Sequence, residues 1–126
     1  MLEIKNLTVK VKNGAPILTD VSLSIDEGTC IGLTGASGSG KTTLIKSIMG
    51  MNGGDLEVPQ GQILLDGDDL LKRSAKERRG LCGKTIGFIP QNPMTAFFPH
   101  AKMDRQIIET LRMHTGTDKK QARELA

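Results

Sequence analysis

Aromatic residues are scarce in this sequence of 126 residues, which has no Trp, no Tyr and three Phe. Proteins that bind single-stranded nucleic acid stack bases on aromatic rings, so this class of protein is disfavoured. Positive charge is also modest, with 17 Lys and Arg against 14 Asp and Glu and a formal net charge of +3. Duplex nucleic acid usually demands a clustered basic stripe. We therefore expect no nucleic acid partner.

Cysteines and long apolar runs are equally sparse. Cys30 and Cys82 are the only cysteines and have no Cys-x-x-Cys spacing, so we expect inert thiols rather than a metal or redox motif. His100 and His114 stand alone and are interpreted as surface residues, not metal ligands. Nowhere do about 18 apolar residues follow one another, and the N-terminus lacks the pattern of a secretory signal. These absences favour a soluble, cytoplasmic protein.

The first third of the chain has the texture of strands. Apolar residues nearly alternate with polar ones over residues 2–11 and again over residues 17–25, on either side of the turn signal Asn13-Gly14. This pattern predicts two half-buried antiparallel strands. Residues Thr29 to Thr34 carry no charge, which predicts a third strand, buried on both faces.

The rest of the chain alternates between helical and strand-like patterns, and its length allows one compact domain at most. Apolar residues at helical spacing around Leu44 and Met49 predict a helix that stops near Gly50. The further elements that we expect are a short strand over Gly61–Gly67, a solvated helix face over Lys72–Arg79, an apolar strand over Lys84–Pro90, an amphipathic helix over Met103–His114 and a last helix capped by Asp118.

A glycine-rich loop carries the chemistry. It lies between the uncharged segment that ends at Thr34 and the helix around Leu44, and it reads Gly35-Ala36-Ser37-Gly38-Ser39-Gly40-Lys41-Thr42. A triphosphate needs many donors at short range and little side-chain bulk. Glycines let successive backbone N–H groups point inward at the positive end of the following helix. The predicted nucleotide-binding residues are Gly35, Ser37, Gly38, Ser39, Gly40, Lys41, Thr42 and Thr43.

Three side chains of this loop have distinct predicted roles. Lys41 reaches the β- and γ-phosphates and is the catalytic candidate of the loop. Thr42 offers its hydroxyl to Mg²⁺, which bridges phosphate oxygens, and Thr43 is placed to bond the α-phosphate. A nucleoside triphosphate and Mg²⁺ are therefore the expected ligands.

The loop, the two strands before it and the stretch Ile86–Pro93 together resemble the ATP-binding subunits of ABC transporters, over nearly all of the chain. The opening Leu2–Leu7 and the phrase Asp20-Val21-Ser22-Leu23 look like the antiparallel β-subdomain of that family. The resemblance implies an α/β fold: a P-loop NTPase core of the RecA-like type with an antiparallel β-subdomain. It also implies a nucleotide-binding core in residues 1–94 and the start of a helical subdomain in residues 95–126.

Gln91 matches the Q-loop glutamine of that family, which implies a contact with Mg²⁺ and its water and a catalytic role. The stretch Gln91–Pro99 is most similar to importers of oligopeptides and of nickel or related metal complexes. The resemblance therefore implies transmembrane permease subunits and a second ATP-binding subunit as partners, at the inner face of the cell membrane.

The sequence departs from the family in what it does not contain. It has no Leu-Ser-Gly-Gly-Gln signature, no strand that ends in the Asp-Glu pair of the Walker B motif and no switch histidine. We expect an N-terminal fragment that binds ATP and hardly hydrolyses it.

Residues Val9 to Lys12 lack the aromatic on which the family stacks adenine. The missing strands would leave an open sheet edge, so we also expect self-association.

Two other functions are compatible with the loop. A nucleotide-binding or interaction module would bind without turnover, and a small kinase would also use a glycine-rich loop with a lysine. About 28 residues precede the loop strand here, which is unusual for such kinases. A GTPase is disfavoured because no Asn-Lys-x-Asp sequence occurs.

Overall fold

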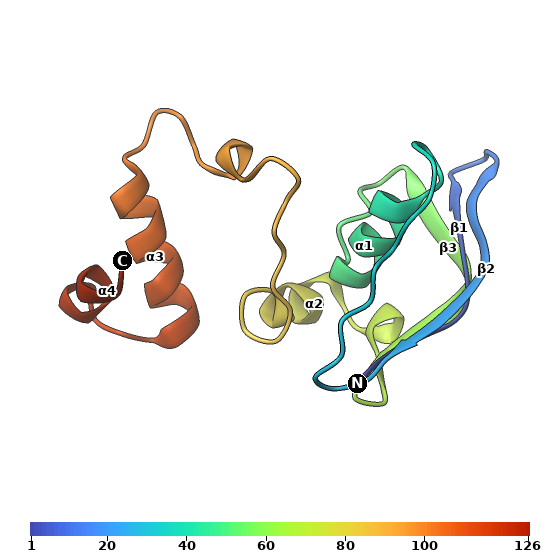
Figure 1. Ribbon diagram of the computed structural model, residues 1–126, viewed down its shortest axis with the longest axis horizontal. Helices are drawn as coiled ribbons and strands as arrows, with labels where there is room; N and C mark the ends of the chain where they lie inside the picture. The colour runs from blue at the N-terminus through green and yellow to red at the C-terminus, as the bar shows by residue number, and fades with distance from the viewer. The chain divides into compact units, whose positions relative to one another are not determined.

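The computed structural model describes every residue from Met1 to Ala126. The chain divides into two compact units, Met1–Gly80 and Leu81–Ala126, and each is described by itself (Figure 1). None of the helices has the length and apolar character needed to cross a membrane.

The first unit is built on an antiparallel sheet with the strand order β2-β1-β3-β4. β1 is in the centre and pairs with β2 on one side and with β3 on the other. The two antiparallel strands predicted at the N-terminus are therefore confirmed. β3 begins earlier than the predicted Gly61, because its pairing with β1 continues through Pro59 to Leu56. The strands are β1 Leu2–Val11, β2 Pro16–Ile25, β3 Leu56–Leu65 and β4 Asp68–Asp69.

The three long strands bend together near their middle. Asn6 of β1, Asp20 of β2 and Gly61 of β3 all have positive φ, at 50°, 53° and 110°. The side-chain amide of Asn6 donates to the Asp20 carboxylate at 2.8 Å, which ties two of the bends together. A Cβ at position 61 would lie 2.5 Å from Leu7 Cα, so only glycine fits there. These bulges give the sheet its local twist.

One face of the sheet is covered by α1, Lys41–Met49 (Figure 1). The buried residues of the sheet and of the segments that cover it form an apolar core. Removing their apolar surface from water stabilises the fold. Its members are Ile4, Leu7, Val9, Leu18, Leu44, Met49, Ile63 and Leu70. The predicted helix is confirmed, and it ends at Gly50 in the left-handed conformation, as the sequence indicates.

After β4 come the short 3-10 helix η1, Leu70–Lys72, and the helix α2, Ala75–Leu81. α2 buries none of its residues, which confirms the predicted solvated helix. Ser74 caps its first turn: the Ser74 hydroxyl and backbone N–H donate to the Glu77 carboxylate at 2.6 and 2.8 Å. The Glu77 N–H donates back to the Ser74 hydroxyl at 3.3 Å, so this is a reciprocal capping box.

Two predicted strands are wrong. The segment Thr29–Thr34 forms no ladder, and Ile31 is 47% exposed instead of buried on both faces. The segment Lys84–Pro90 makes one isolated bridge, between Cys82 and Ile86, and Ile89 is 88% exposed. An apolar sequence can form a strand only when another strand accepts its hydrogen bonds. No segment of this chain pairs along either of these two.

The second unit contains η2, Pro93–Ala96, α3, Met103–Thr115, and α4, Lys119–Leu125. Both predicted C-terminal helices are confirmed, and Asp118 caps α4 in a capping box with Gln121. The Gln106 side chain bonds the backbone N–H and carbonyl of Phe98 at 2.8 and 3.0 Å, which holds the preceding loop on α3. This unit begins at Leu81, and the predicted domain boundary after residue 94 stays a prediction.

Candidate phosphate-binding site

The glycine-rich loop leaves the extended segment at Thr34 and enters α1 at Lys41. Gly35, Gly38 and Gly40 have φ angles of 152°, 80° and 88°, which L-residues with side chains rarely adopt. A turn closes within the loop, where the Ser39 N–H donates to the Ala36 carbonyl at 3.3 Å. The backbone is therefore folded into the concave shape that the sequence predicts.

Gly40 fixes the loop on the sheet. It is the N-cap residue of α1, and a Cβ added there would lie 2.6 Å from Leu18 Cδ2 and 3.1 Å from the Ile17 carbonyl oxygen. Both partners belong to β2. The start of α1 can approach the strand this closely only because position 40 carries no side chain.

The first turn of α1 is open to a negative charge. Its first helical hydrogen bond runs from the Leu44 N–H to the Gly40 carbonyl at 2.9 Å, so the N–H groups of the three preceding residues have no partner within the helix. No side chain caps this end, and the first turn has no acidic residue. Anions bind at such ends because the helix dipole and the N–H groups both favour negative charge.

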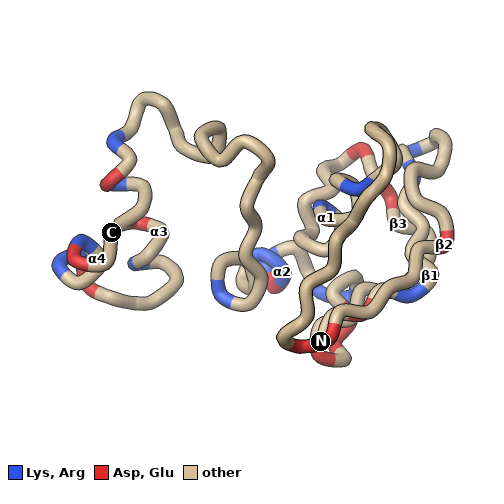
Figure 2. Tube along the Cα trace, in the orientation of Figure 1, with Lys and Arg blue, Asp and Glu red and all other residues tan.

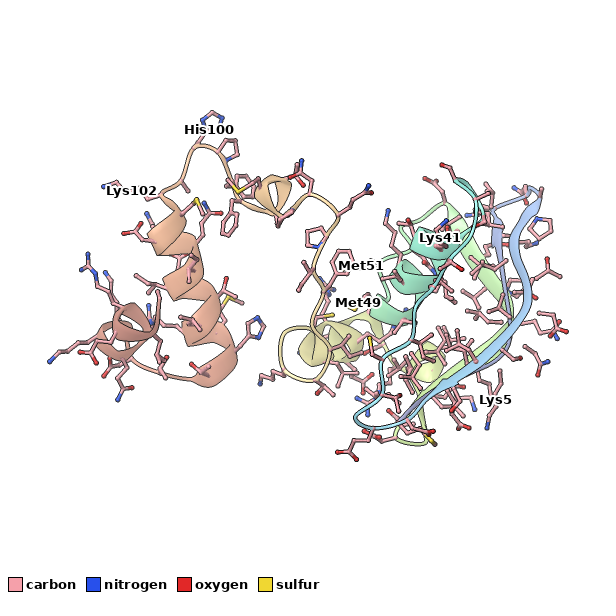
Figure 3. All side chains as sticks on the ribbon, in the orientation of Figure 1. Lys5, Lys41, Met49, Met51, His100 and Lys102 are labelled. Atoms are coloured by element: carbon pink, nitrogen blue, oxygen red, sulfur yellow. The ribbon has the colours of Figure 1, made fainter.

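The Lys41 side chain folds back over the loop instead of extending into solvent. Its Nζ donates to the carbonyls of Gly35 and Ala36, both at 2.7 Å, and to the Ser39 hydroxyl at 3.3 Å. Figure 3 labels Lys41 at the start of α1. The ammonium is thus held beside the same loop whose N–H groups favour an anion, which concentrates positive charge there.

The threonines that follow lie in the first helical turn. Thr42 is exposed and Thr43 is partly exposed. Further along the helix, the buried Ser47 hydroxyl lies 2.8 Å from the Thr43 carbonyl and 3.1 Å from Asn52 Oδ1. This pair of bonds ties α1 to the turn beyond its C-terminal end and so holds the helix that carries the loop.

A hollow of about 250 Å³ lies beside the loop. It is bounded by Gly35, Ser39 and Lys41 of the loop region. Its lining also includes Thr34 and Gly40 and four apolar side chains from β2, the extended segment and α1, which are Leu18, Val21, Leu33 and Leu44.

A comparison with protein families identifies the family of the chain. The model of the ABC transporter family matches residues 18–126, which contain the whole loop. The chain belongs to the ABC transporter family.

Curated relatives of this ABC transporter chain are similar over most of it. The dipeptide transport ATP-binding protein DppD of Lactococcus lactis is 35% identical over 117 residues, which are 90% of this chain and 34% of the relative. The metal-staphylopine import system ATP-binding protein CntD of Staphylococcus aureus is also 35% identical over 117 residues, 92% of this chain and 43% of the relative. The chain thus spans between a third and a half of the length of these relatives.

The fold agrees with a solved structure. The dimeric structure of MJ0796, a bacterial ABC transporter cassette, matches 98% of this chain and 53% of its own chain, with a TM-score of 0.81 and 22% identity. The chain therefore has the ABC cassette fold, α/β with an antiparallel sheet, as the resemblance implied.

The structure gathers the predicted phosphate-binding residues of this ABC transporter chain into one loop and one helical turn in the unit Met1–Gly80. Gln91 is exposed and belongs to the other unit, just before η2. Its predicted contact with Mg²⁺ stays a prediction.

Sequence reasoning missed two parts of the site. The Ala36 carbonyl binds the Lys41 ammonium, and Leu18 of β2 sets the closest approach to Gly40. The residue type at position 36 could not have predicted this contact, because the atom that accepts the hydrogen bond is a backbone oxygen. The third glycine of the motif, in contrast, does indicate a close approach of the loop to another segment.

Proposed function

We propose that this chain binds Mg-ATP through residues 35–43 and acts as the ATP-binding part of an ABC importer. One observation carries the proposal: the Lys41 ammonium is held over a glycine loop at the uncapped start of α1. Positive charge and free N–H donors occur there together, which is the chemistry that a polyphosphate requires.

Different residues of the loop would contact different phosphates of the ligand. Backbone N–H groups from Gly35 to Gly40, with Ser37 and Ser39 in the same loop, would surround the phosphates. Lys41 would contact the β- and γ-phosphates and Thr43 the α-phosphate. The Lys41 amine already points into the loop, so it would exchange carbonyl partners for phosphate oxygens.

Mg²⁺ would be held by Thr42 together with phosphate oxygens and water, and Gln91 is the second side chain that we propose as its contact. The exposed Thr42 hydroxyl, in the first turn of α1, supports the first part of this assignment. When bound, the ion would supply charge neutralisation at the β- and γ-phosphates. Gln91 is exposed, so it is accessible for such a contact.

The transported cargo is proposed from the relatives. One is named as a dipeptide transport protein, another as part of metal-staphylopine import and a third, OppD of Haemophilus influenzae, as an oligopeptide transport protein. We propose import of peptides or metal complexes, with transmembrane permease subunits and a second ATP-binding subunit as partners. The protein would then lie on the cytoplasmic face of the membrane.

These 126 residues are proposed to bind ATP without efficient hydrolysis. Phosphoryl transfer to water needs a group that positions the water, and after the glycine loop the sequence has neither the Walker B Asp-Glu pair nor the Leu-Ser-Gly-Gly-Gln signature of the family. We also propose that segments 29–34 and 84–90 pair with strands outside this sequence. Their exposed apolar side chains, including Ile31 and Ile89, support that pairing.

Calorimetric titration of Mg-ATP into the full chain tests the proposal. Binding should be lost in Lys41→Ala and kept in Lys46→Ala, which removes a lysine from the far end of the same helix. Phosphate release, followed in parallel, should stay at the background rate. Binding that survives in Lys41→Ala, or turnover by the unaltered chain, would contradict it.

A further inference from the structure

A second positively charged hollow lies in the unit Leu81–Ala126, between α3 and α4. Its volume is about 500 Å³. The two helices pack together, and each contributes one buried apolar residue, Ile108 from α3 and Ala122 from α4. Five basic and two acidic side chains line the hollow with Ile108: Lys102, Arg105, Arg112, Lys119, Arg123, Asp104 and Glu109.

The two carboxylates in this lining are already engaged. Glu109 pairs with the Arg105 guanidinium at 3.1 Å, and Asp104 accepts the backbone N–H of Arg105 at 2.7 Å. The other four cations, Lys102, Arg112, Lys119 and Arg123, make no ion pair. The hollow therefore has an excess of uncompensated positive charge.

Repulsion between these positive charges destabilises the helices α3 and α4. Lys119 and Arg123 are four residues apart on α4, where like charges repel each other. Arg112 adds a third positive charge from α3, across the hollow. Figure 2 shows Lys and Arg positions along both helices. A bound anion would remove this repulsion.

We propose that the hollow between α3 and α4 binds a ligand that carries a phosphate group. Guanidinium groups match phosphate oxygens with two parallel hydrogen bonds, and three arginines line the hollow. A volume of about 500 Å³ suits a small phosphorylated compound. The phosphate belongs either to a free metabolite or to a phospholipid headgroup. The site is independent of the glycine loop, which lies in the other unit.

The test uses the full chain with Lys41→Ala, which weakens the first phosphate site and separates the two proposals. Inorganic pyrophosphate is titrated by calorimetry, and flotation with phosphatidylglycerol vesicles represents the headgroup. Arg112→Gln with Arg123→Gln removes two cations of the hollow. Lys84→Gln with Lys120→Gln is the matched control, because these exposed lysines belong to the same unit but not to the lining. Circular dichroism checks that all variants fold.

We expect saturable binding that weakens at least about tenfold in the double arginine variant, since each lost bond to a charged group is worth more than 1.4 kcal/mol. The double lysine control should change it less than about twofold. Pyrophosphate binding identifies a free phosphorylated ligand, and vesicle binding alone identifies a headgroup. The proposal is overturned if neither probe binds, if both double variants weaken binding equally, or if poly-glutamate binds more tightly than both probes.

Discussion

The antiparallel sheet and the segments 29–34 and 84–90 are both predicted as strands from their sequences, but only the sheet forms paired strands. Apolar residues recur along β1 and β3, and Leu7 of β1 and Ile63 of β3 are fully buried. Residues 29–34 and 84–90 also contain several apolar residues, yet Leu33 is 43% exposed and Ile89 is 88% exposed. All of these segments read as strands, and only those with a partner in the chain become strands.

The difference shows where the stability of the first unit lies. The strand β1 is held from two sides, by its pairing with β2 and with β3. The segment 29–34 connects β2 to the glycine loop without a ladder of its own. The loop is therefore anchored through Gly40 on β2 and through α1, not through the segment that precedes it.

The same substitution in both regions gives the largest expected effect. Leu7→Ala removes a fully buried side chain from the centre of the sheet and should cost about 2–5 kcal/mol of the free energy of unfolding. Leu33→Ala should cost less than about 1 kcal/mol because Leu33 is already largely in water. Urea unfolding followed by circular dichroism measures both. Equal losses would mean that segment 29–34 is as well packed as β1.

A pair of glycine substitutions sharpens the comparison at the level of the backbone. Gly61→Ala forces an L-residue to φ 110° and brings its Cβ 2.5 Å from Leu7 Cα, so it should cost at least about 1–3 kcal/mol. Gly87→Ala, in the unpaired segment, meets no atom within 4 Å and should be nearly neutral. Denaturant midpoints of the two variants check this order. A neutral Gly61→Ala would contradict the coupled bend of the three strands.

Local signals in the sequence predicted the elements whose causes are local. The caps at Gly50 and Asp118, the helices around Leu44 and Ile108, and the first two strands were all predictable, because each depends on neighbouring residues. The strands at 29–34 and 84–90 could not be judged in this way. The burial of such a segment depends on residues distant in sequence, and no local pattern reports whether a partner strand is present.

The candidate site also has features that the sequence predicted and features that it could not predict. The motif predicted which residues form the loop, since their types follow from the chemistry of phosphate binding. It could not predict that Lys41 bonds the Gly35 and Ala36 carbonyls, or that Leu18 limits the space at Gly40. Those contacts depend on the path of the backbone and on a strand about twenty residues away.

The unpaired segments should also make the chain associate with itself. An apolar segment that pairs with no strand along its length is a template for pairing with a second chain. We expect the apparent mass in light scattering to rise with protein concentration and to rise less in a variant with Leu33→Lys and Ile89→Lys. Met113→Lys is the control, because Met113 is exposed but lies on the helix α3 and not in an unpaired segment. This variant should associate as the unaltered chain does. A constant monomer mass at high concentration would refute the expectation.

The smallest expected effect is a pH dependence at the edge of the first unit. The Ser74 hydroxyl, and then the Ser74 N–H, donate to Glu77 and lower the pKa of its carboxyl below the ordinary 4.5. The charged form is thus favoured by folding. Its contribution is present above about pH 4.5 and is lost as the pH falls through the lower folded pKa. Urea midpoints measured from about pH 6 to about pH 3 should fall less steeply for Glu77→Gln than for the unaltered chain. If Glu77→Gln leaves the slope unchanged, the capping box between Ser74 and Glu77 does not form in solution.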